Sequence, residues 1–398
     1  MSDTIKITPP ADMKTAGNAY TGFNPTVRMF PPQSAATDNR TTTGGNEITV
    51  LDRHHARKTE LEDLVGGVDI NPYISQDLDD SSRLYSDLDA VGAKYAVLTE
   101  FAEGGTAKVS IARDKNLRRL VAIKSLKKDA ENLQEQLDAF VTEAKVTAQL
   151  DHPGIIPIYG LFRDDEGGTH LVMKLVDGKT LREYLRNLTM NFRVRGINAF
   201  DEWILLRKRL EIFVRVCDTI AYAHHRNVIH RDLKPENIMI GKFMEVYVMD
   251  WGLSKVISKD DPPPSPDSKI SGTPRYFPPE VLRGEPLDLR SDIFTLGLIL
   301  QEVVTLQYAV TGNDANEFVD HILKGELEPI VHKFNRKIDK TIQAIIRKAT
   351  AYDVEDRYQT VDELAEDLRR YMGGHSTSAR PETLLEKITR HIFHHHHR

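Results

Sequence analysis

The chain has 398 residues, of which 40% are hydrophobic and 28% charged, so it is a globular protein longer than one ordinary domain. A net charge of -6 and the lack of a long apolar run argue against a nucleic-acid partner and a membrane span, and we expect a cytoplasmic location. The single cysteine, Cys217, excludes an intramolecular disulfide.

Residues 1–93 differ in composition from the rest of the chain. Residues 1–46 are rich in Thr, Asn, Ala, Gly and Pro and show neither a helical nor a strand period, which predicts a disordered tail. Residues 77–89 carry five aspartates among Ser and Leu, and we interpret them as a solvated linker rather than a docking motif. The sequence assigns no role to residues 1–80.

A β-rich region is predicted from Lys94 onward. Three runs with strand-like alternation or β-branched residues, separated by turn residues, predict an antiparallel meander, and two further strands are expected after it. Apolar residues at three- and four-residue spacing predict a helix over about 130–150 between these two groups of strands. The five expected strands cover residues 94–102, 107–115, 118–127, 155–162 and 169–176.

The chain becomes mostly helical after Gly178. Apolar residues from Leu210 to His224 trace one face of a long helix, which makes Cys217 a buried structural thiol rather than a nucleophile. Further helices are expected around residues 293–303 and 338–371, whereas the PPPSP run at 262–266 predicts an exposed loop. The predicted fold class is α+β, with a small β-rich lobe followed by a larger α-rich lobe.

Residues 228–237 read VIHRDLKPEN, and with this motif the chain resembles the eukaryotic-type protein kinases. The other motifs of that family follow in order, and the DWG triplet is typical of the bacterial serine/threonine kinases among them. The resemblance implies a bilobal kinase fold over residues 94–372, between the tail and linker at 1–93 and a basic tail at 373–398. The further motifs are VAIK ending at Lys124, Glu143 on the next helix, DWG at 250–252, PPE at 278–280, RSDIFTLG at 290–297 and EDRY at 355–358.

The resemblance implies an ATP- and Mg²⁺-dependent phosphoryl transfer to protein hydroxyls, which needs charge neutralisation and positioning more than covalent help. It implies that Lys124 contacts the α- and β-phosphates and that Glu143 holds its ammonium group. It implies that Asp232 accepts or orients the proton of the acceptor hydroxyl and that Lys234 neutralises the γ-phosphate.

Two residues are implied as metal ligands. Asp250 is the expected principal ligand of Mg²⁺ and Asn237 the second, because a hard cation prefers oxygen donors and keeps water and phosphate for its remaining positions.

The nucleotide loop departs from the family pattern, because Ala102 and Ala107 replace two of its three glycines. The remaining glycines let the backbone approach phosphates, so we expect a weaker or stiffer clamp rather than none. Val109 and Ala122 would close over the adenine, above Met239. The implied nucleotide-binding residues are Phe101, Ala102, Glu103, Gly104, Gly105, Thr106, Ala107, Val109, Ala122, Lys124, Met173 as gatekeeper, Lys174 and Val176 at the base edge, and Met239.

The catalytic-loop motif resembles that of serine/threonine kinases, and Thr273 in GTPRY is placed to hydrogen-bond Asp232 and Lys234. We therefore expect protein substrates with Ser or Thr acceptors. Arg231 precedes the catalytic aspartate and calls for an anion, which in the family is a phosphorylated residue of the activation loop. The candidates for such autophosphorylation, which self-association of two chains would allow in trans, are Ser258, Ser265, Ser268 and Ser271.

Some residues are expected to be structural under any interpretation. Glu280 and Arg357 should form a buried ion pair, Asp292 should hold the backbone of the catalytic loop, and Trp251 should pack under the helix that carries Glu143. The insert at 187–203 is either a docking loop or filler, and the histidines at 394–397 receive no role. The resemblance and the absent membrane span together predict an enzyme without its own transmembrane sensor.

Two other function classes stay open at this stage. The missing glycines permit a pseudokinase-like scaffold with weak nucleotide binding, although Lys124, Glu143, Asp232, Asn237 and Asp250 are all present. A small-molecule phosphotransferase is the third reading, and the PPE segment, Thr273 and Arg357 argue against it because they build a platform for a peptide.

Overall fold

The computed structural model describes residues 94–103, 107–127, 133–164, 167–196, 198–257 and 271–381, with the side chains of 101–103, 133, 135, 199 and 200 left out. Several expectations lie outside this part of the chain. They concern residues 1–93, the glycines of the nucleotide loop, the proline-rich loop at 262–266, the serines at 258, 265 and 268, and the histidines at 394–397.

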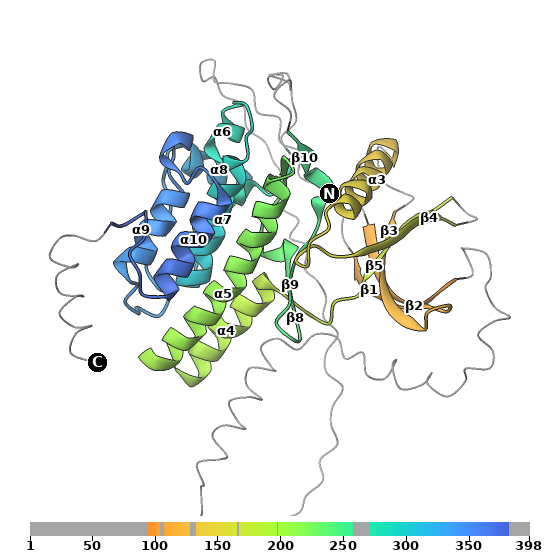
Figure 1. Ribbon diagram of the computed structural model, residues 1–398, viewed down its shortest axis with the longest axis horizontal. Coiled ribbons are helices and arrows are strands. Elements are labelled where there is room, and N and C mark those ends of the chain that lie inside the picture. Colours follow the sequence, from red (N-terminus) through yellow and green to blue (C-terminus); the bar gives the residue numbers. More distant parts are fainter. Residues whose placement is uncertain are drawn as a thin grey trace, which may run out of the picture.

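The described chain forms two lobes, a β-rich one and a helical one (Figure 1). This agrees with the predicted α+β architecture. The smaller lobe holds an antiparallel sheet in the order β1-β2-β3-β5-β4, flanked by one helix. Its elements are β1 (Tyr95–Glu103), β2 (Ala107–Asp114), β3 (Arg119–Leu126), α3 (Leu133–Gln149), β4 (Ile158–Arg163) and β5 (Thr169–Lys174).

The small sheet has a core on each face. Helix α3 covers one face, where Phe140 and Ala144 bury themselves against Leu171 of β5. On the other face, small and β-branched residues of β2, β3 and β5 form a second cluster. Tyr95 of the edge strand β1 stacks on Phe162 of the opposite edge strand β4, with ring centroids 5.7 Å apart. Because the two edges touch, the sheet is curled, and its second core is closed by its own strands.

The larger lobe begins at β6. Its strands are β6 (Gly178–Thr180), β7 (Val228–Ile229), β8 (Ile238–Gly241), β9 (Val246–Val248) and β10 (Lys255–Val256). Its helices are α4 (Leu181–Arg195), α5 (Ala199–His224), α6 (Pro279–Leu282), α7 (Arg290–Thr305), α8 (Ala315–Leu323), α9 (Lys340–Ala349) and α10 (Val361–Met372). Short 3₁₀ helices are η2 (Pro235–Asn237), η3 (Trp251–Leu253), η4 (Pro274–Tyr276) and η5 (Val354–Asp356).

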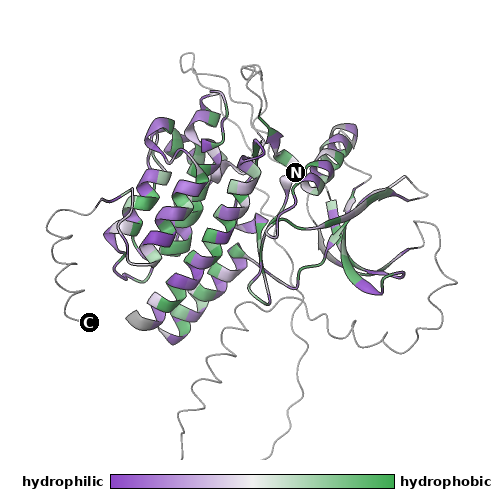
Figure 2. Cartoon of the chain, in the orientation of Figure 1, coloured by the Kyte–Doolittle hydropathy of each residue, from purple (hydrophilic) through white to green (hydrophobic). Residues whose placement is uncertain are grey.

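Helix α7 is the centre of this lobe. Every residue from Ser291 to Thr305 is buried, so the helix has no solvent face. The surrounding helices instead carry one apolar and one polar face, which Figure 2 shows as alternating green and purple along α5 and α10. Cys217 lies on the apolar face of α5, fully buried, and burial raises the pKa of its thiol. The thiol is therefore structural, as expected.

Most of the described residues of the insert at 187–203 belong to two helices. Residues 187–195 complete α4, and 199–203 form the first turn of α5, whose N-cap Asn198 accepts a hydrogen bond from the Asp201 amide at 2.9 Å. The apolar pattern had placed this helix only from Leu210 onward. The pattern fails because the fully buried Arg209 takes a core position, where it donates to the Val303 carbonyl and to Glu202.

Residues 373–381 do not leave the lobe where α10 ends. The carboxylate of Asp367 on α10 accepts hydrogen bonds from the amides of Ser378 and Ala379 and from the hydroxyls of Ser378 and Tyr358, at 2.7 to 2.9 Å. Burial alone would raise the pKa of Asp367, but these donors lower it. The domain boundary at 372 stays a prediction. The hydrogen bonds to Asp367 hold residues 376–381, here called the strap, against α10.

Candidate active site

The catalytic-loop motif forms the segment between β7 and β8, and both carboxylate oxygens of Asp232 are held there. Thr273 donates its hydroxyl to Oδ1 at 3.0 Å, and Lys234 donates its ammonium to Oδ2 at 2.7 Å. The same ammonium reaches Thr273 Oγ1 at 2.9 Å. The Asn237 amide group donates to the Asp232 carbonyl at 2.8 Å. The expected contacts of Thr273 are thus confirmed, and Asp232 is fixed in one orientation.

Asp292 of α7 supports this loop from below, as expected. Its carboxylate accepts the backbone amides of His230 and Arg231 at 2.8 and 3.1 Å. His224, at the end of α5, donates to the same carboxylate at 2.8 Å, a contact the sequence did not reveal. Burial would raise the pKa of Asp292, but the His224 bond and the amides lower it. Arg231 has a φ of +69°, a left-handed conformation that the hydrogen bonds of the His230 and Arg231 amides to Asp292 stabilise.

Lys124 of β3 lies at the junction of the lobes. Its ammonium group donates to both oxygens of Glu143 on α3, at 2.7 and 2.8 Å, and to Asp250 Oδ1 at 3.2 Å. Burial disfavours the charged amine, but the two carboxylates outweigh it and raise the pKa of Lys124. The lysine is a fixed cation. Gly252 lies close to the Glu143 carboxylate, because a Cβ atom added to this glycine would be 3.2 Å from Glu143 Oε2.

Trp251 lies in a turn that contacts α3, in line with the expectation, and it also packs under the catalytic loop. It is almost fully buried in the core of the large lobe, and its ring centroid lies 4.5 Å from that of His230. The 3₁₀ turn η3 that contains it lies beside α3. The indole is therefore a large-lobe side chain under the catalytic loop.

The expected nucleotide-binding residues that the structure describes lie on strands of both lobes and just after β5. Residues 101–103 belong to β1, where Ala102 pairs with Val109 and Glu103 with Lys108, and Ala107 begins β2. Ala122 of β3 stands opposite Met173 of β5. Lys174 ends β5, Val176 follows it, and Met239 lies on β8 opposite Thr180. The loop tip at 104–106 is outside the described residues, so the clamp stays a prediction.

The donor set fits a phosphate-bound divalent cation. Asp250 supplies a half-exposed carboxylate, and Asn237 has an amide oxygen that accepts no hydrogen bond from the described residues. Within those same residues, no group of three or more His, Cys, Asp or Glu side chains could hold a metal. A carboxylate and an amide oxygen suit an ion that takes its other ligands from phosphate and water.

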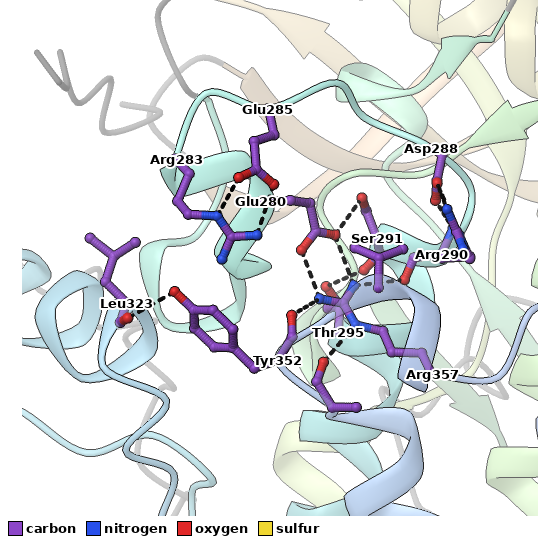
Figure 3. A network of polar contacts seen from close by, with 12 residues as sticks. Glu280, Arg283, Glu285, Asp288, Arg290, Ser291, Thr295, Leu323, Tyr352 and Arg357 are labelled. Atoms are coloured by element: carbon purple, nitrogen blue, oxygen red, sulfur yellow. Dashed lines mark hydrogen bonds and ion pairs between the residues drawn. The ribbon is translucent and has the colours of Figure 1, made fainter.

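The platform beyond the catalytic loop is anchored by the expected pair of Glu280 and Arg357 (Figure 3). The Arg357 guanidinium donates to both oxygens of Glu280 at 2.8 and 2.7 Å, and both residues are buried. Ser291 of α7 donates its hydroxyl to Glu280 as well, at 2.8 Å. The segment after the activation loop is thus joined to α7 and to the chain near η5.

A second ionic network was missed by sequence reasoning. Arg182 of α4 donates to Glu236 of the catalytic loop at 2.7 Å and to buried Glu302 of α7 at 2.6 Å. It also donates to the hydroxyl of Tyr276, which itself donates to Glu302 at 2.7 Å. Burial disfavours the charged guanidinium, yet Glu302 and its neighbours raise the pKa of Arg182. No motif signals such contacts, because Arg182 lies 54 to 120 residues from its three partners in the sequence.

Comparison with known proteins agrees with this geometry. The protein kinase domain model matches residues 95–368. The serine/threonine-protein kinase PknD of Protochlamydia amoebophila is 33% identical over 301 residues, covering 71% of this chain and 30% of that protein. The protein of the same name from Chlamydia abortus is 32% identical over 295 residues, covering 70% of this chain and 31% of that protein. The chain thus spans about a third of the length of these relatives.

The described helices include none that is both long and apolar enough to cross a membrane. The match of the family model extends over both lobes and includes the catalytic loop, the Lys124 and Glu143 pair and the platform, so the chain belongs to the protein kinase family.

Proposed function

We propose that this protein is a serine/threonine protein kinase, which transfers the γ-phosphoryl group of ATP to Ser or Thr hydroxyls of proteins. The observation that carries the proposal is the arrangement of Lys234, Thr273 and Asp232, which leaves one carboxylate oriented beside a fixed cation. Lys124, Glu143 and Asp250 form a second charged cluster. Such an arrangement positions phosphates and an acceptor hydroxyl.

Each side chain has one task in this proposal. Lys124 binds the α- and β-phosphates, and its bond to Glu143 keeps the ammonium on the nucleotide side. Lys234 neutralises charge on the transferring phosphoryl group. Asp232 orients the acceptor hydroxyl and takes its proton. Thr273 prevents rotation of the carboxylate, so Asp232 meets each substrate in the same geometry.

Asp250 and Asn237 would hold Mg²⁺ together with the nucleotide. When bound, the ion neutralises phosphate charge and acts as a Lewis acid. The contact between Asp250 and Lys124 gives these two residues a matched pair of charges even before nucleotide enters.

The scaffold and small-molecule alternatives have no observation in their favour. The five charged or amide residues expected of an active kinase are all described, and they lie in hydrogen-bonded contact in two clusters. The anchored platform supports a peptide acceptor.

Regulation by phosphorylation is also part of the proposal. The pKa of Arg231 is lowered by burial, which the nearby Asp292 opposes, and no side chain of the described residues pairs with its guanidinium. An unpaired, partly buried guanidinium favours an anion. We infer that a phosphorylated activation-loop serine, Ser271 or one of those outside the described residues, supplies it by autophosphorylation between two chains. Phosphatase treatment should then lower activity, and unchanged activity would contradict this step.

The test of the main proposal is incubation with labelled ATP and magnesium, with the wild type compared to Asp232→Asn. We expect label on serine or threonine in the wild type, little in the variant, and none when EDTA removes magnesium. Equal labelling of both proteins would overturn the assignment as a kinase. Label found only on tyrosine would overturn the substrate class.

A further inference from the structure

Two arginines contact one aromatic ring beside the catalytic loop. The Arg182 and Arg275 guanidinium carbons lie 4.6 and 4.0 Å from the centre of the Tyr308 ring. Arg275 belongs to η4 and follows Thr273 by two residues, so their Cα atoms are at most about 7 Å apart. Thr273 contacts Asp232, so Arg275 lies beside the place where an acceptor hydroxyl would be bound.

The two arginines differ in how their charge is balanced. Arg182 pairs with two carboxylates, those of Glu236 and Glu302. Each of these acidic groups next to the catalytic loop therefore already has a cationic partner within the chain. A basic substrate residue would have to compete with Arg182 for the exposed Glu236, where the charge-assisted hydrogen bond is already made.

Arg275 has no acidic partner among the described residues. It donates one hydrogen bond to the Val310 carbonyl, and its guanidinium lies over the rings of Tyr308 and Phe318, the latter at 4.1 Å. The ring contacts and the carbonyl fix its position and leave further N–H donors along its edge. Tyr308 is 41% exposed, so the surface beside this guanidinium is open to solvent. A fixed guanidinium with unused donors is a receptor for a carboxylate.

We propose that Arg275 selects acidic peptides, by pairing with an Asp or Glu side chain near the acceptor Ser or Thr. Arg182 reinforces the choice, because it keeps Glu236 and Glu302 from recruiting a basic residue. This inference rests on the proposed function and adds the substrate class to it.

The experiment uses three serine peptides that differ only in the residues on both sides of the acceptor, which are Glu, Ala or Arg. The full chain is assayed for kcat/KM with each peptide. Binding is measured separately by fluorescence anisotropy, with labelled copies in which alanine replaces the acceptor serine. For the wild type we expect the Glu peptide to exceed the Ala peptide roughly tenfold in both measurements, the size of one hydrogen-bonded charge pair, and the Arg peptide to be the poorest.

Three variants separate charge from packing. Arg275→Met keeps an unbranched chain between the two rings and should lose the preference for Glu, whereas Arg275→Lys should keep part of it. Arg193→Met removes an exposed arginine from the far end of α4 and should leave the preference unchanged. In Arg275→Met, both kcat/KM and binding affinity should rise for the Arg peptide relative to the Glu peptide.

The outcomes distinguish the two proposals. Equal binding of all three peptides, or a Glu preference that survives in Arg275→Met, overturns the role of Arg275. If binding is selective for Glu and depends on Arg275, but neither a peptide nor the chain itself is phosphorylated, the proposed function is overturned. The role of Arg275 as a receptor for acidic side chains then stands. A merely structural Arg275 would lower catalysis for all three peptides alike and leave their ranking unchanged, which also contradicts the inference.

Discussion

At the residue scale, the hydroxyl of Thr273 performs two tasks, because it donates to Asp232 and accepts from Lys234. We expect Thr273→Ala to lower kcat by about tenfold to a hundredfold, since one charge-assisted hydrogen bond on each side is lost. Thr273→Ser keeps the hydroxyl and should retain most of the activity. Steady-state kinetics on a serine peptide checks this, and equal loss in both variants would mean that the methyl group matters more than the hydroxyl.

Asp292 carries a pH-dependent contribution to stability. Its pKa in the folded protein lies below the ordinary value of 3.8, so its contribution is complete above that value and is lost as the pH falls through the lowered pKa. Asp292→Asn should cost about 3 kcal/mol at neutral pH, because His224 and two amides lose a charged acceptor. The free energy of unfolding of the variant should depend less on pH below about 4.

Urea unfolding at several pH values measures both effects. The matched control is Asp288→Asn, at a partly exposed carboxylate that pairs with Arg290 just before the same helix. Asp288→Asn should lower the free energy of unfolding by less than about 1 kcal/mol. If the free energy of unfolding falls equally with decreasing pH in the wild type and in Asp292→Asn, this pH dependence does not come from Asp292.

The contacts within the HRDLKPEN loop are the part of the candidate site that follows most directly from the sequence. A loop such as HRDLKPEN brings Asp232, Lys234 and Asn237 together within six positions, so their contacts follow from local geometry. His224, Arg182 and Arg275 act through partners distant in the chain. An arginine that pairs with a carboxylate across two helices looks the same in sequence as one in solvent, so the structure was needed to find these residues.

At the element scale, the platform after the activation loop depends on one buried ion pair. Glu280→Gln should destabilise the protein by about 3 kcal/mol, because Arg357 then stays buried without its charged partner. The double variant Glu280→Gln/Arg357→Met should recover part of this loss, since no charge is left unpaired. Urea unfolding of the single and double variants completes the cycle. A double variant no better than the sum of the single ones would argue against coupling.

The strap at 376–381 depends on Asp367. We expect Asp367→Asn to speed hydrogen exchange of the Ser378 and Ala379 amides roughly tenfold or more, since both amides donate to its carboxylate. Asp362→Asn, on an exposed part of the same helix, is the control and should leave both amides unchanged. Mass spectrometry of the peptides that contain these residues reports the rates, and equal protection in both variants would show that the strap is held by other contacts.

Element boundaries follow the sequence wherever the apolar period is intact. Helix α3 lies within its expected range, and α10 ends one residue beyond the helical range expected for 338–371. The start of α5 could not be placed, because buried Arg209 and Glu202 satisfy each other at positions where the pattern requires apolar residues. The strap was likewise missed, since its small polar residues look like those of a linker until Asp367 provides an acceptor.

At the scale of the whole molecule, the lobes meet in the charged cluster of Lys124, Glu143 and Asp250. A ligand that binds this cluster should hold both lobes together and stabilise the fold. At a hundred times its dissociation constant, ATP with magnesium should add about 2.7 kcal/mol to the free energy of unfolding. The thermal midpoint, followed by scanning fluorimetry, should rise further with ATP and magnesium than with ATP alone. Asp250→Asn should abolish that difference. A magnesium effect that persists in the variant would show that the metal binds without Asp250.

The ionic network of Arg182 has a consequence for how such chains diverge. One guanidinium serves Glu236, Glu302 and Tyr276, which belong to three separate elements, and neither Arg182 nor Glu302 can change alone without removing the charged partner of the other. In an alignment of relatives the columns of Arg182 and Glu302 should therefore covary. Sequences that lack the arginine should also lack the buried glutamate, and both changes should appear together on the same branch of a family tree.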